Sequence, residues 1–557
     1  MSIKRKFLLI GLDGATFDII NPLVAEGKLP NIASLMKNGV SAPLKSTIPP
    51  NTAVAWTSMT TGVNPGKHGI FYFTESPHKN YCQEHLLNAS DIGFKKLWEI
   101  LSGVGEKSIV IGVPFTYPPT EINGIIITGE KGKERVITHP PEFAQELTKR
   151  FKRPNEWTKL KTLFGSIPTA EFLERYLNAQ IKQIEFLQEV MKYLIKEYEW
   201  TFFMGAFLSP DQVQHFFWKY MDKSHILHNP KSPSKYKDAI YKIYQLVDSA
   251  IGQILSLVDD ETTVIIASDH GGGPIHKYLQ LNMWLEQQGY LTRKREVSHR
   301  FKTFYPTLYK CLTKVKLTSV GNILPPKLRN LKIPMVKKVE STSAELINWV
   351  NTKAYATHWG ISVNLQDRER EGTVPSNEYE GLIKEITDKL YEMQAPQTNK
   401  KIIQKVIRKE ELYNGPYVKN STDILVIPDP LYGIRGNFIK DKQFLQQIDN
   451  TEAISSNHRQ DGIFIMKGHG IKKGLKLNGT PEIVDITPTI LYLMSQPVLA
   501  QMDGKVIKEA IEPAFLQENP IRISEEDGFV QQIEGFKLPP EEEAAAKEQL
   551  KALGYIE

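Results

Sequence analysis

The sequence predicts an α/β protein with a doubly wound, mostly parallel sheet sandwiched by helices. Two observations carry this prediction. Short apolar runs such as residues 7–12 alternate with amphipathic helical stretches such as residues 236–257, which is the pattern of parallel strands joined by crossover helices. Two apolar runs also lead into residues able to do chemistry, Asp13 and Asp269-His270. The carboxyl ends of parallel strands open into a common crevice, so these residues should meet there.

Strands are predicted where a short apolar run is bounded by turn-forming residues. The first run ends in Asp13-Gly14, and the segment at residues 42–48 ends in Pro49-Pro50, which stops an extended chain. In chain order the predicted strands are residues 7–12, 42–48, 108–113, 124–128, 201–208, 262–268, 355–357, 361–365, 424–427 and 463–466.

Helices are predicted where apolar residues recur with the period of one helical face. The clearest case is residues 236–257, whose apolar stripe is typical of core packing and not of a cofactor site. In chain order the predicted helices are residues 29–36, 94–101, 170–199, 236–257, 378–393 and 540–553, with a further helix that begins near Thr52 and ends near Gly62.

Two stretches interrupt the alternation of strands and helices and are interpreted as insertions that form a cap. Residues 132–168 are polar and contain prolines, and residues 291–345 are strongly basic. The resulting division has a catalytic core in three parts with two insertions and a tail. These six parts are residues 1–131 (core), 132–200 (helical insertion), 201–290 (core), 291–345 (basic insertion or cap), 346–510 (core) and 511–557 (tail with a terminal helix).

Composition indicates a globular protein with a substantial core, since 41% of the 557 residues are hydrophobic. No apolar run approaches the roughly 20 residues that span a bilayer. The basic start of the chain resembles the first part of a signal peptide, but Asp13 interrupts the apolar run and no cleavage site follows. Cys82 and Cys311 give neither a disulfide framework nor a thiolate metal site. A reducing, cytoplasmic location is therefore expected.

Positive charge is concentrated in residues 293–338. This segment holds thirteen Lys and Arg against one acid, Glu296, whereas the net charge of the whole chain is only +6. A solvated basic face is the ordinary interpretation of such a run. The aromatic residues within it leave a second interpretation open, a surface for an anionic substrate or for peripheral contact with anionic lipid.

The stretch at residues 49–69 is the one around which the predicted site is organised. After Pro49-Pro50 the chain turns into a helix, and Thr52 stands at or next to its N-cap. A hydroxyl there lies in the positive field of a helix N-terminus, which favours phosphate oxygens. A capping role alone is the simpler interpretation of an isolated threonine, so the case for a site depends on the rest of the chain.

Aspartate and histidine follow several of the other predicted strands. Asp211 and His215 are four residues apart and so share one face of a helical turn. Asp269-His270 precede three glycines, which let backbone approach a site closely. His458 lies just ahead of the strand at residues 463–466. Asp and His sets suit Zn²⁺ or Mn²⁺. The prediction of a metal site rests on the ordered set and not on any single residue.

Taken together, these motifs resemble the alkaline phosphatase superfamily and, within it, the type I phosphodiesterase and nucleotide pyrophosphatase group. The resemblance covers nearly the whole chain except the insertions and the tail. The segments that carry it are GLDG at residues 11–14, PPNTAVAWTSMTTGVNPGKHGI at 49–70, SPDQVQH at 209–215, SDHGGG at 268–273, NHRQDG at 457–462, DITPTILYLM at 485–494 and MDGKVI at 502–507.

The resemblance implies two divalent metal ions, with Zn²⁺ expected and Mn²⁺ as the alternative. It places Asp211, His215 and His458 on one ion. It places Asp13, Asp269, His270 and the oxygen of Thr52 on the other, with Thr52 as the nucleophile that takes up the phosphoryl group. Two such ions can stabilise the attacking and leaving oxygens and lower the pKa of the nucleophile, which a threonine hydroxyl needs at neutral pH.

The chain departs from the family pattern in one respect. Diesterases of this group usually carry an Asn some way after the nucleophile, whose amide stabilises the developing phosphate charge, but Thr52 is closely followed by residues that cannot do this, Ala53, Val54 and Ala55. Asn51, Lys67 or a basic residue of an insertion are the candidates to supply the charge. Arg459, next to His458, is a further candidate for holding a terminal phosphate.

The function expected from these observations is metal-dependent hydrolysis of phosphodiester or pyrophosphate bonds. The substrate would be a small phosphorylated molecule such as a nucleotide or a lipid-linked phosphate, and no binding of nucleic-acid duplexes is expected; the oligomeric state stays open. A cofactor-independent phosphomutase is the alternative within the superfamily, whereas the sulfatase motif is missing around Thr52. The alternative of another class is an anionic-surface binding protein with a vestigial site.

Overall fold

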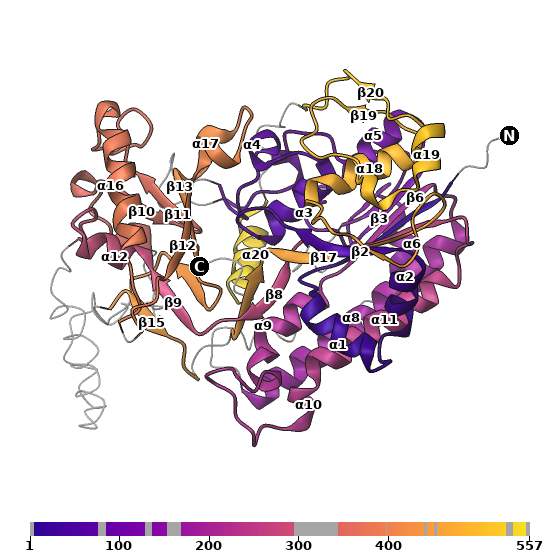
Figure 1. Ribbon diagram of the computed structural model, residues 1–557, viewed down its shortest axis with the longest axis horizontal. Helices are drawn as coiled ribbons and strands as arrows, with labels where there is room; N and C mark the ends of the chain where they lie inside the picture. Colours follow the sequence, from indigo (N-terminus) through magenta and orange to yellow (C-terminus); the bar gives the residue numbers. More distant parts are fainter. Residues whose placement is uncertain are drawn as a thin grey trace, which may run out of the picture.

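The first strand, β1 (Phe7–Leu12), is buried along its whole length and lies in the middle of the largest sheet. The computed structural model describes residues 5–75, 85–128, 136–152, 169–294, 343–396, 398–438, 443–450, 454–530 and 538–552 (Figure 1). Within these residues the sheet has nine strands. In spatial order they are β18 (Leu475–Lys476), β2 (Val40–Lys45), β17 (Asp461–Lys467), β7 (Thr263–Ala267), β1, β6 (Phe202–Phe207), β3 (Ser108–Ile111), β4 (Gly124–Ile127) and β5 (Thr138–His139).

The centre of this sheet is parallel, as predicted. β1 pairs in parallel with β7 on one side and β6 on the other, and β3 continues in parallel with β6 and β4. β17 runs antiparallel between β7 and β2. Because β7, β1 and β6 are neighbours with one direction, the residues that follow them lie together at one edge of the sheet.

Helices cover both faces of the sheet, and β1 contributes to both cores. Its side chains alternate, so Leu8, Ile10 and Leu12 belong to one apolar cluster while Phe7 and Leu9 belong to the other. The first face is covered by α1 (Phe17–Ala25), α2 (Pro30–Asn38), α6 (Phe143–Arg150), α8 (Ala170–Glu197), α9 (Ser209–Met221) and α11 (Ala239–Leu255). The second face is covered by α3 (Thr52–Thr61), α5 (Leu97–Gly103), α18 (Ile486–Leu493) and α19 (Pro513–Glu518).

The long helix α8 differs from its predicted role as part of an insertion. It forms where it was expected, but twelve of its residues are buried, and it packs against α9 and α11 in the core of the first face. The preceding strand β5 extends the main sheet. Residues 136–152 and 169–200 therefore belong structurally to the core, and residues 153–168 lie outside the described part of the chain.

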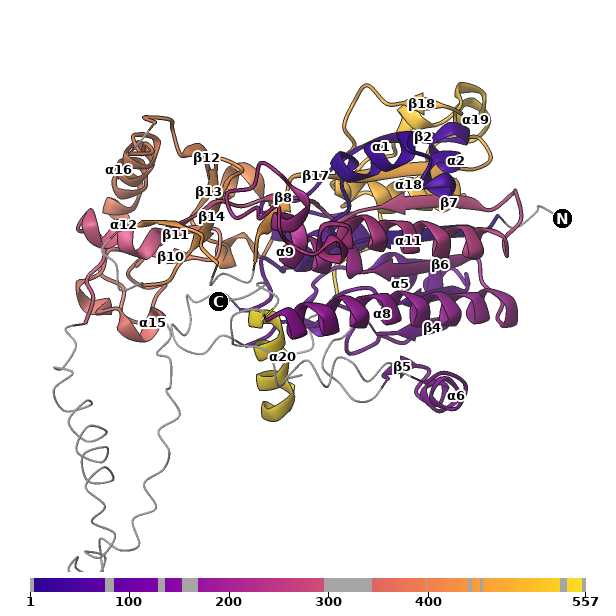
Figure 2. The same ribbon diagram turned by 90° about the horizontal axis from the view of Figure 1, so that it is seen from below.

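A second lobe is built from residues 277–294, 343–396, 398–438 and 443–447 and lies at one end of the main lobe (Figures 1 and 2). Its four-stranded antiparallel sheet has the order β10 (Ala354–Thr357), β11 (Gly360–Val363), β13 (Ile424–Pro428) and β12 (Ile403–Arg408). α12 (Leu281–Gln287) and α16 (Tyr379–Tyr391) pack on it around a separate apolar core. Three further strands, β14 (Tyr432–Arg435), β9 (Lys277–Gln280) and β15 (Leu445–Gln447), form a small sheet beside it.

This lobe corrects the predicted return to the core at residue 346. The predicted strands near residues 355, 361 and 424 exist, but they pair with one another and not with the main sheet. The chain returns to the main sheet only at β17. Most of the basic insertion, residues 295–342, lies outside the described residues, so its predicted cap and membrane roles stay predictions.

The last part of the chain runs back over the main lobe. β19 (Val498–Leu499) pairs with β20 (Ile523–Ser524), and Phe529 bridges to Phe94. The predicted terminal helix is present as α20 (Pro540–Ala552), where Glu543 accepts a hydrogen bond from the backbone N–H of Leu86. Among the described helices, none is both long enough and apolar enough to cross a bilayer.

A short helix, α4 (Pro65–His68), follows α3 and ends in a fully buried histidine. His68 Nδ1 accepts a hydrogen bond from the N–H of Ile70 at 3.1 Å, so Nε2 carries the proton and donates to Ser58 Oγ at 2.8 Å. Burial lowers the pKa of His68 to about 3. The native protein therefore holds His68 neutral where an ordinary histidine begins to take up a proton.

This burial predicts acid sensitivity. Unfolded His68 binds a proton below about pH 6.5 whereas folded His68 does not, so its contribution to stability is lost progressively as pH falls from that value. Between about pH 7.5 and pH 5 the loss should be about 2 kcal/mol. Urea unfolding of wild type and His68→Gln at both pH values measures this loss. The difference in the free energy of unfolding between the two proteins should be smaller at pH 5 by this amount. A difference that does not change with pH would contradict the assignment.

Candidate active site

Three aspartates meet at the carboxyl edge of the main sheet. Asp13 directly follows β1, Asp269 follows β7, and Asp211 lies in the first turn of α9, just after β6. All three side chains are buried, with at most 2% of each residue exposed. In Figures 1 and 2 this edge of the main lobe faces the second lobe, with β8 (Gly271–Pro274) between them.

A tight turn at Gly14 ties the three aspartates together. The N–H of Gly14 donates to Asp269 Oδ1 at 3.1 Å, and the N–H of Asp211 donates to the carbonyl of Asp13 at 3.0 Å. Gly14 has a φ of 66°, and a Cβ at this position would lie 2.6 Å from the Cβ of Asp211. Only glycine fits this turn, both for its left-handed backbone and for the close approach of α9.

Three histidines lie over these carboxylates. His215 is one helical turn after Asp211 on α9, and its Nε2 lies 3.2 Å from Asp211 Oδ2. His270 Nε2 lies 3.2 Å from Asp269 Oδ2 and 3.7 Å from Asp13 Oδ1. The third, His458, is on β16 (Ser456–Arg459), which pairs with β8 and places His458 opposite Gly272. His458 Nε2 lies 3.7 Å from Asp211 Oδ1.

The backbone fixes the tautomer of all three imidazoles. His215 Nδ1 lies 3.1 Å from the carbonyl oxygen of Ser456, His270 Nδ1 lies 3.0 Å from that of Gly271, and His458 Nδ1 lies 2.8 Å from that of Pro50. A carbonyl oxygen only accepts, so each Nδ1 carries a proton and donates it. In the neutral form each Nε2 then presents a lone pair, which is the arrangement of metal-ligating histidines.

The Nε2 lone pairs of these histidines lie so close together that a cation between them would stabilise the arrangement. His215 Nε2 and His458 Nε2 are 3.3 Å apart, and the rings of His270 and His458 stack with centroids 3.8 Å apart. Two neutral Nε2 atoms whose protons are on Nδ1 cannot form a hydrogen bond with each other. A proton or a metal ion between the nitrogen atoms and the carboxylates resolves this conflict.

The pKa values reflect the crowding of charges. Burial alone would favour the neutral acid of Asp211, but His215 and His458 hold its pKa far below the usual range. Burial would likewise lower the pKa of His215, but Asp211 outweighs it and raises that pKa. The pKa of Asp269 is raised by burial and by the charge of Asp211. The pKa of His458 is lowered by burial and by its neighbour His270.

Thr52 completes the cluster. Asn51 is the N-cap of α3, where its Oδ1 accepts from the N–H of Ala53 at 3.1 Å, and Thr52 is the first helical residue. Its Oγ1 lies 3.2 Å from His270 Nε2. Trp56, one turn further along α3, donates its indole N–H to Asp13 Oδ2 at 3.1 Å. Helix α3 therefore contacts the carboxylates through Trp56 and presents the Thr52 hydroxyl beside them.

The donor set fits metal ions in two overlapping groups. Asp211, His215 and His458 form one group and Asp13, Asp211 and His270 the other, and within each the potential ligand atoms lie within 4.8 Å of one another. Asp211 is common to both, which the sequence pattern did not predict. Asp269 is outside the second group, although its Oδ2 lies close to His270. Buried carboxylate and imidazole donors of this kind suit Zn²⁺ or Mn²⁺.

The three residues predicted to bind substrate differ in their surroundings. Asn51 adjoins Thr52, but its side-chain oxygen caps α3. Lys67 is on α4 and forms an ion pair with Asp503 at 2.7 Å, so its charge is already matched. Arg459 adjoins His458 and donates to the backbone carbonyls of Pro274 and His458; among the described residues it forms no ion pair with a carboxylate. Of these three candidates, Arg459 is thus the cation whose charge no described carboxylate neutralises through an ion pair.

Sequence reasoning missed Trp56 as part of the site. Its position four residues after Thr52 puts both on one face of α3, and this spacing was the available signal. The backbone carbonyls of Pro50, Gly271 and Ser456, which orient the histidines, have no signal in the sequence because any residue could supply them.

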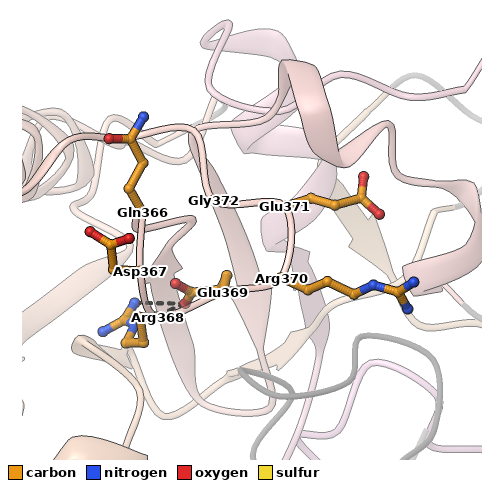
Figure 3. A pocket seen from close by; sticks show the side chains of 7 residues that line it. All are labelled: Gln366, Asp367, Arg368, Glu369, Arg370, Glu371 and Gly372. Carbon is orange, nitrogen blue, oxygen red and sulfur yellow. Dashed lines mark hydrogen bonds and ion pairs between the residues drawn. The ribbon is translucent and has the colours of Figure 1, made fainter.

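A hollow of about 570 Å³ lies elsewhere, in the second lobe, and Figure 3 shows the loop Gln366–Gly372 that lines it. It shares no residue with the Asp and His cluster. Arg368 in this loop is tied to Glu369 at 2.8 Å and to Asp423 at 2.6 Å. These contacts anchor the loop to the second lobe and do not mark a second active site.

The fold is of the mixed α/β class, and its buried Asp and His cluster follows the strands of the main sheet. A family model for type I phosphodiesterase/nucleotide pyrophosphatase matches residues 7–458, and the chain belongs to this family. The family resemblance predicted from the sequence is confirmed, and the chain is an enzyme of the phosphodiesterase and pyrophosphatase type. In a comparison with curated proteins no sequence matches the chain.

Several solved structures are similar to it at low identity. Human ectonucleotide pyrophosphatase/phosphodiesterase 5 has 13% identity and a TM-score of 0.47, with 92% of this chain and 99% of that chain covered. An inactive variant of the murine protein in complex with AMP has 12% identity and a TM-score of 0.47, covering 88% and 95%. Phosphonoacetate hydrolase from Sinorhizobium meliloti in complex with phosphonoformate has 13% identity and a TM-score of 0.48, covering 87% and 94%. At these values the likenesses do not bear on substrate or residue roles.

Proposed function

We propose that the protein is a metal-dependent hydrolase of phosphodiester or pyrophosphate bonds that works through a phosphothreonine at Thr52. The observation that carries this proposal is the convergence of three backbone-oriented imidazole Nε2 atoms and buried carboxylates beside the Thr52 hydroxyl. The reaction would take place at the carboxyl edge of the main sheet, where this cluster lies.

In the proposed reaction, Thr52 Oγ1 loses its proton and attacks phosphorus, and the bond to the leaving oxygen breaks. The leaving group takes up a proton, and water then attacks the phosphothreonine to release phosphate or a phosphate monoester and to restore the hydroxyl. Thr52 is the first residue of α3, and the positive field of this helix N-terminus favours the phosphoryl oxygens. Trp56 keeps Asp13 in place through its indole hydrogen bond.

The residues that would hold metal are Asp211, His215 and His458 for one ion and Asp13, Asp269 and His270 for the other, with the Thr52 oxygen joining the second set. Asp211 lies close enough to Asp13 and His270 to contribute to the second ion as well. When bound, such ions withdraw charge from phosphoryl oxygens and lower the pKa of a coordinated hydroxyl. Three imidazoles among the donors favour Zn²⁺ over Mn²⁺.

The substrate class is tested by a panel of chromogenic aryl phosphate monoester, diester and sulfate ester, assayed with Zn²⁺ and with Mn²⁺. The proposal expects the diester to be hydrolysed in a metal-dependent way. Phosphoryl transfer within a phosphorylated substrate, without release of phosphate, would instead indicate the phosphomutase alternative, which the family match does not favour. A protein that holds no metal and hydrolyses nothing would indicate a vestigial site on a binding protein.

Arg459 provides a more specific prediction about substrate preference. The surroundings of Thr52 on α3 are uncharged, which favours a diester monoanion over a monoester dianion. Arg459 keeps its positive charge at neutral pH, since burial lowers its pKa only to about 10. Wild type should prefer the diester, and Arg459→Ala should lower kcat/KM for the monoester roughly ten-fold more than for the diester, because a charge-assisted hydrogen bond is lost.

Matched aryl substrates measure this preference, and Arg459→Lys serves as the control that keeps the charge. A wild-type preference for the monoester that survives in Arg459→Ala would contradict both the preference and the role of Arg459.

A further inference from the structure

Gln214 lies on α9 between two of the proposed metal ligands, Asp211 and His215, and is 1% exposed. Its side-chain Nε2 donates to the carbonyl oxygen of Gly14 at 2.8 Å and to that of Pro210 at 3.1 Å. Both acceptors are carbonyls, so the orientation of the amide is fixed. The side chain therefore joins α9 to the turn that follows Asp13.

The turn held by Gln214 is the one that organises the carboxylates. The carbonyl oxygen of Gly14 accepts the hydrogen bond from Gln214 Nε2, and the N–H of Gly14 donates to Asp269 Oδ1 at 3.1 Å. The preceding residue, Asp13, accepts the N–H of Asp211 on its carbonyl. Restraining the Gly14 carbonyl restrains the left-handed turn at Gly14, and through it the directions of both the Asp13 and the Asp269 side chains.

The other side of the Gln214 amide faces β8. A Cβ at Gly272 would lie 2.3 Å from Gln214 Oε1, so the side chain fills the space that this glycine leaves. Gly272 is the residue opposite His458 in the β8–β16 pair. Gln214 thus lies between the turn that carries Asp13 and the ladder that carries His458.

We propose that Gln214 is a positioning residue of the active site. It holds the Asp13-Gly14 turn so that the carboxylates of Asp13 and Asp269 face His270 and Thr52. This inference rests on the proposed metal-dependent function. Groups that orient metal ligands typically change metal affinity or activity by roughly 10–100-fold when they are removed.

The chain offers a matched control in Gln212, two residues away on the same helix. It is 2% exposed, and its Oε1 accepts from Gln180 Nε2 at 2.8 Å, so its amide contacts α8 and not the site. Each of the two glutamines has one buried amide atom without a hydrogen-bond partner among the described residues, Oε1 of Gln214 and Nε2 of Gln212. Replacing either by methionine therefore removes a comparable buried amide.

The test compares wild type, Gln214→Met and Gln212→Met as full-length proteins. Bound zinc is counted by elemental analysis after equilibration with a graded chelator, the unfolding midpoint of the metal-free proteins is measured, and kcat and KM are determined for an aryl diester. Gln214→Met should lower the affinity for one of the two zinc ions roughly 10–100-fold, and it should lower kcat more than it changes KM. Gln212→Met should keep a zinc affinity within about two-fold of wild type.

Equal zinc affinity in the two variants would overturn the positioning role. If both affinities match wild type, Gln214 has no effect on the metal site. If both are lowered equally, the substitutions have only loosened α9 in general. If Gln214→Met does not fold, Gln214→Asn replaces it, because it keeps the amide but cannot reach Gly14, and the same loss of one zinc ion is expected. A wild-type protein that binds no zinc would overturn the proposed function and this inference with it. If wild type binds two zinc ions and the two variants have equal zinc affinities, the inference about Gln214 is overturned but the proposed function is not.

Discussion

Replacing Thr52 by alanine is expected to lower kcat by roughly 10⁴–10⁶-fold, the range found when a catalytic nucleophile is removed. The physical reason is that the hydroxyl 3.2 Å from His270 Nε2 is the group beside the Asp and His cluster that can form a covalent phosphoryl bond. The fold should change little, because the cap of α3 is provided by Asn51 and not by Thr52. Most of the metal should be retained, because the Asp and His ligands are still present.

The matched control is Thr61→Ala at the other end of the same helix. Thr61 is also fully buried, but its hydroxyl donates to the backbone carbonyl of Thr57. Thr61→Ala should keep kcat close to wild type, and Thr52→Ser, which restores a hydroxyl, should recover part of it. Acid-quenched wild type should carry phosphate on Thr52 in peptide mass spectra. Turnover by Thr52→Ala near the wild-type rate would rule out the nucleophile assignment.

Much of this site could be predicted because its residues follow strand ends. Asp13, Asp211 and Asp269 each come shortly after the end of an apolar run, and parallel strands bring such positions together without any further information. The same logic predicted the central strands β1, β6 and β7 and the helix α11. These are local patterns, and the tertiary structure preserves them.

What could not be predicted depends on partners far away in the sequence. The strands β10, β11 and β13 have the same apolar character as those of the main sheet, and only their pairing shows that they form a separate antiparallel sheet. β-propensity describes a half-buried pleated surface and not the sheet to which a strand belongs. The prediction of a core segment starting at residue 346 was wrong for this reason.

Lys67 and α8 illustrate the same limit. Lys67 was a candidate substrate ligand because it is the nearest cation after α3, but Asp503, more than 400 residues later, pairs with it. Helix α8 follows a polar, proline-bearing stretch and so resembled part of an insertion, yet its apolar face packs against α9 and α11. In both cases the deciding contact is made with residues that no local pattern connects.

Asp211 should be the ligand whose loss affects the metal site most. It lies in both groups of potential ligands. Its Oδ2 lies 3.2 Å from His215 Nε2, and its Oδ1 lies 3.7 Å from His458 Nε2. Asp211→Ala should therefore release the ion held with His215 and His458 and weaken the second ion. His458→Ala should release only the first, although residue 458 lies far from Asp211 in the sequence.

Metal content and stability measure this effect together. In wild type, zinc at about 100 times its dissociation constant should add about 2.7 kcal/mol per site to the free energy of unfolding, and Asp211→Ala should lose most of this gain. Asp248→Ala is the control, because Asp248 is an equally buried aspartate that caps α2 through the N–H groups of Asn31 and Ile32. It should cost about 1 kcal/mol as a lost helix cap while keeping both zinc ions. Full zinc content in Asp211→Ala would show that the two groups are not metal sites, since removal of the carboxylate common to both would then have no consequence for binding.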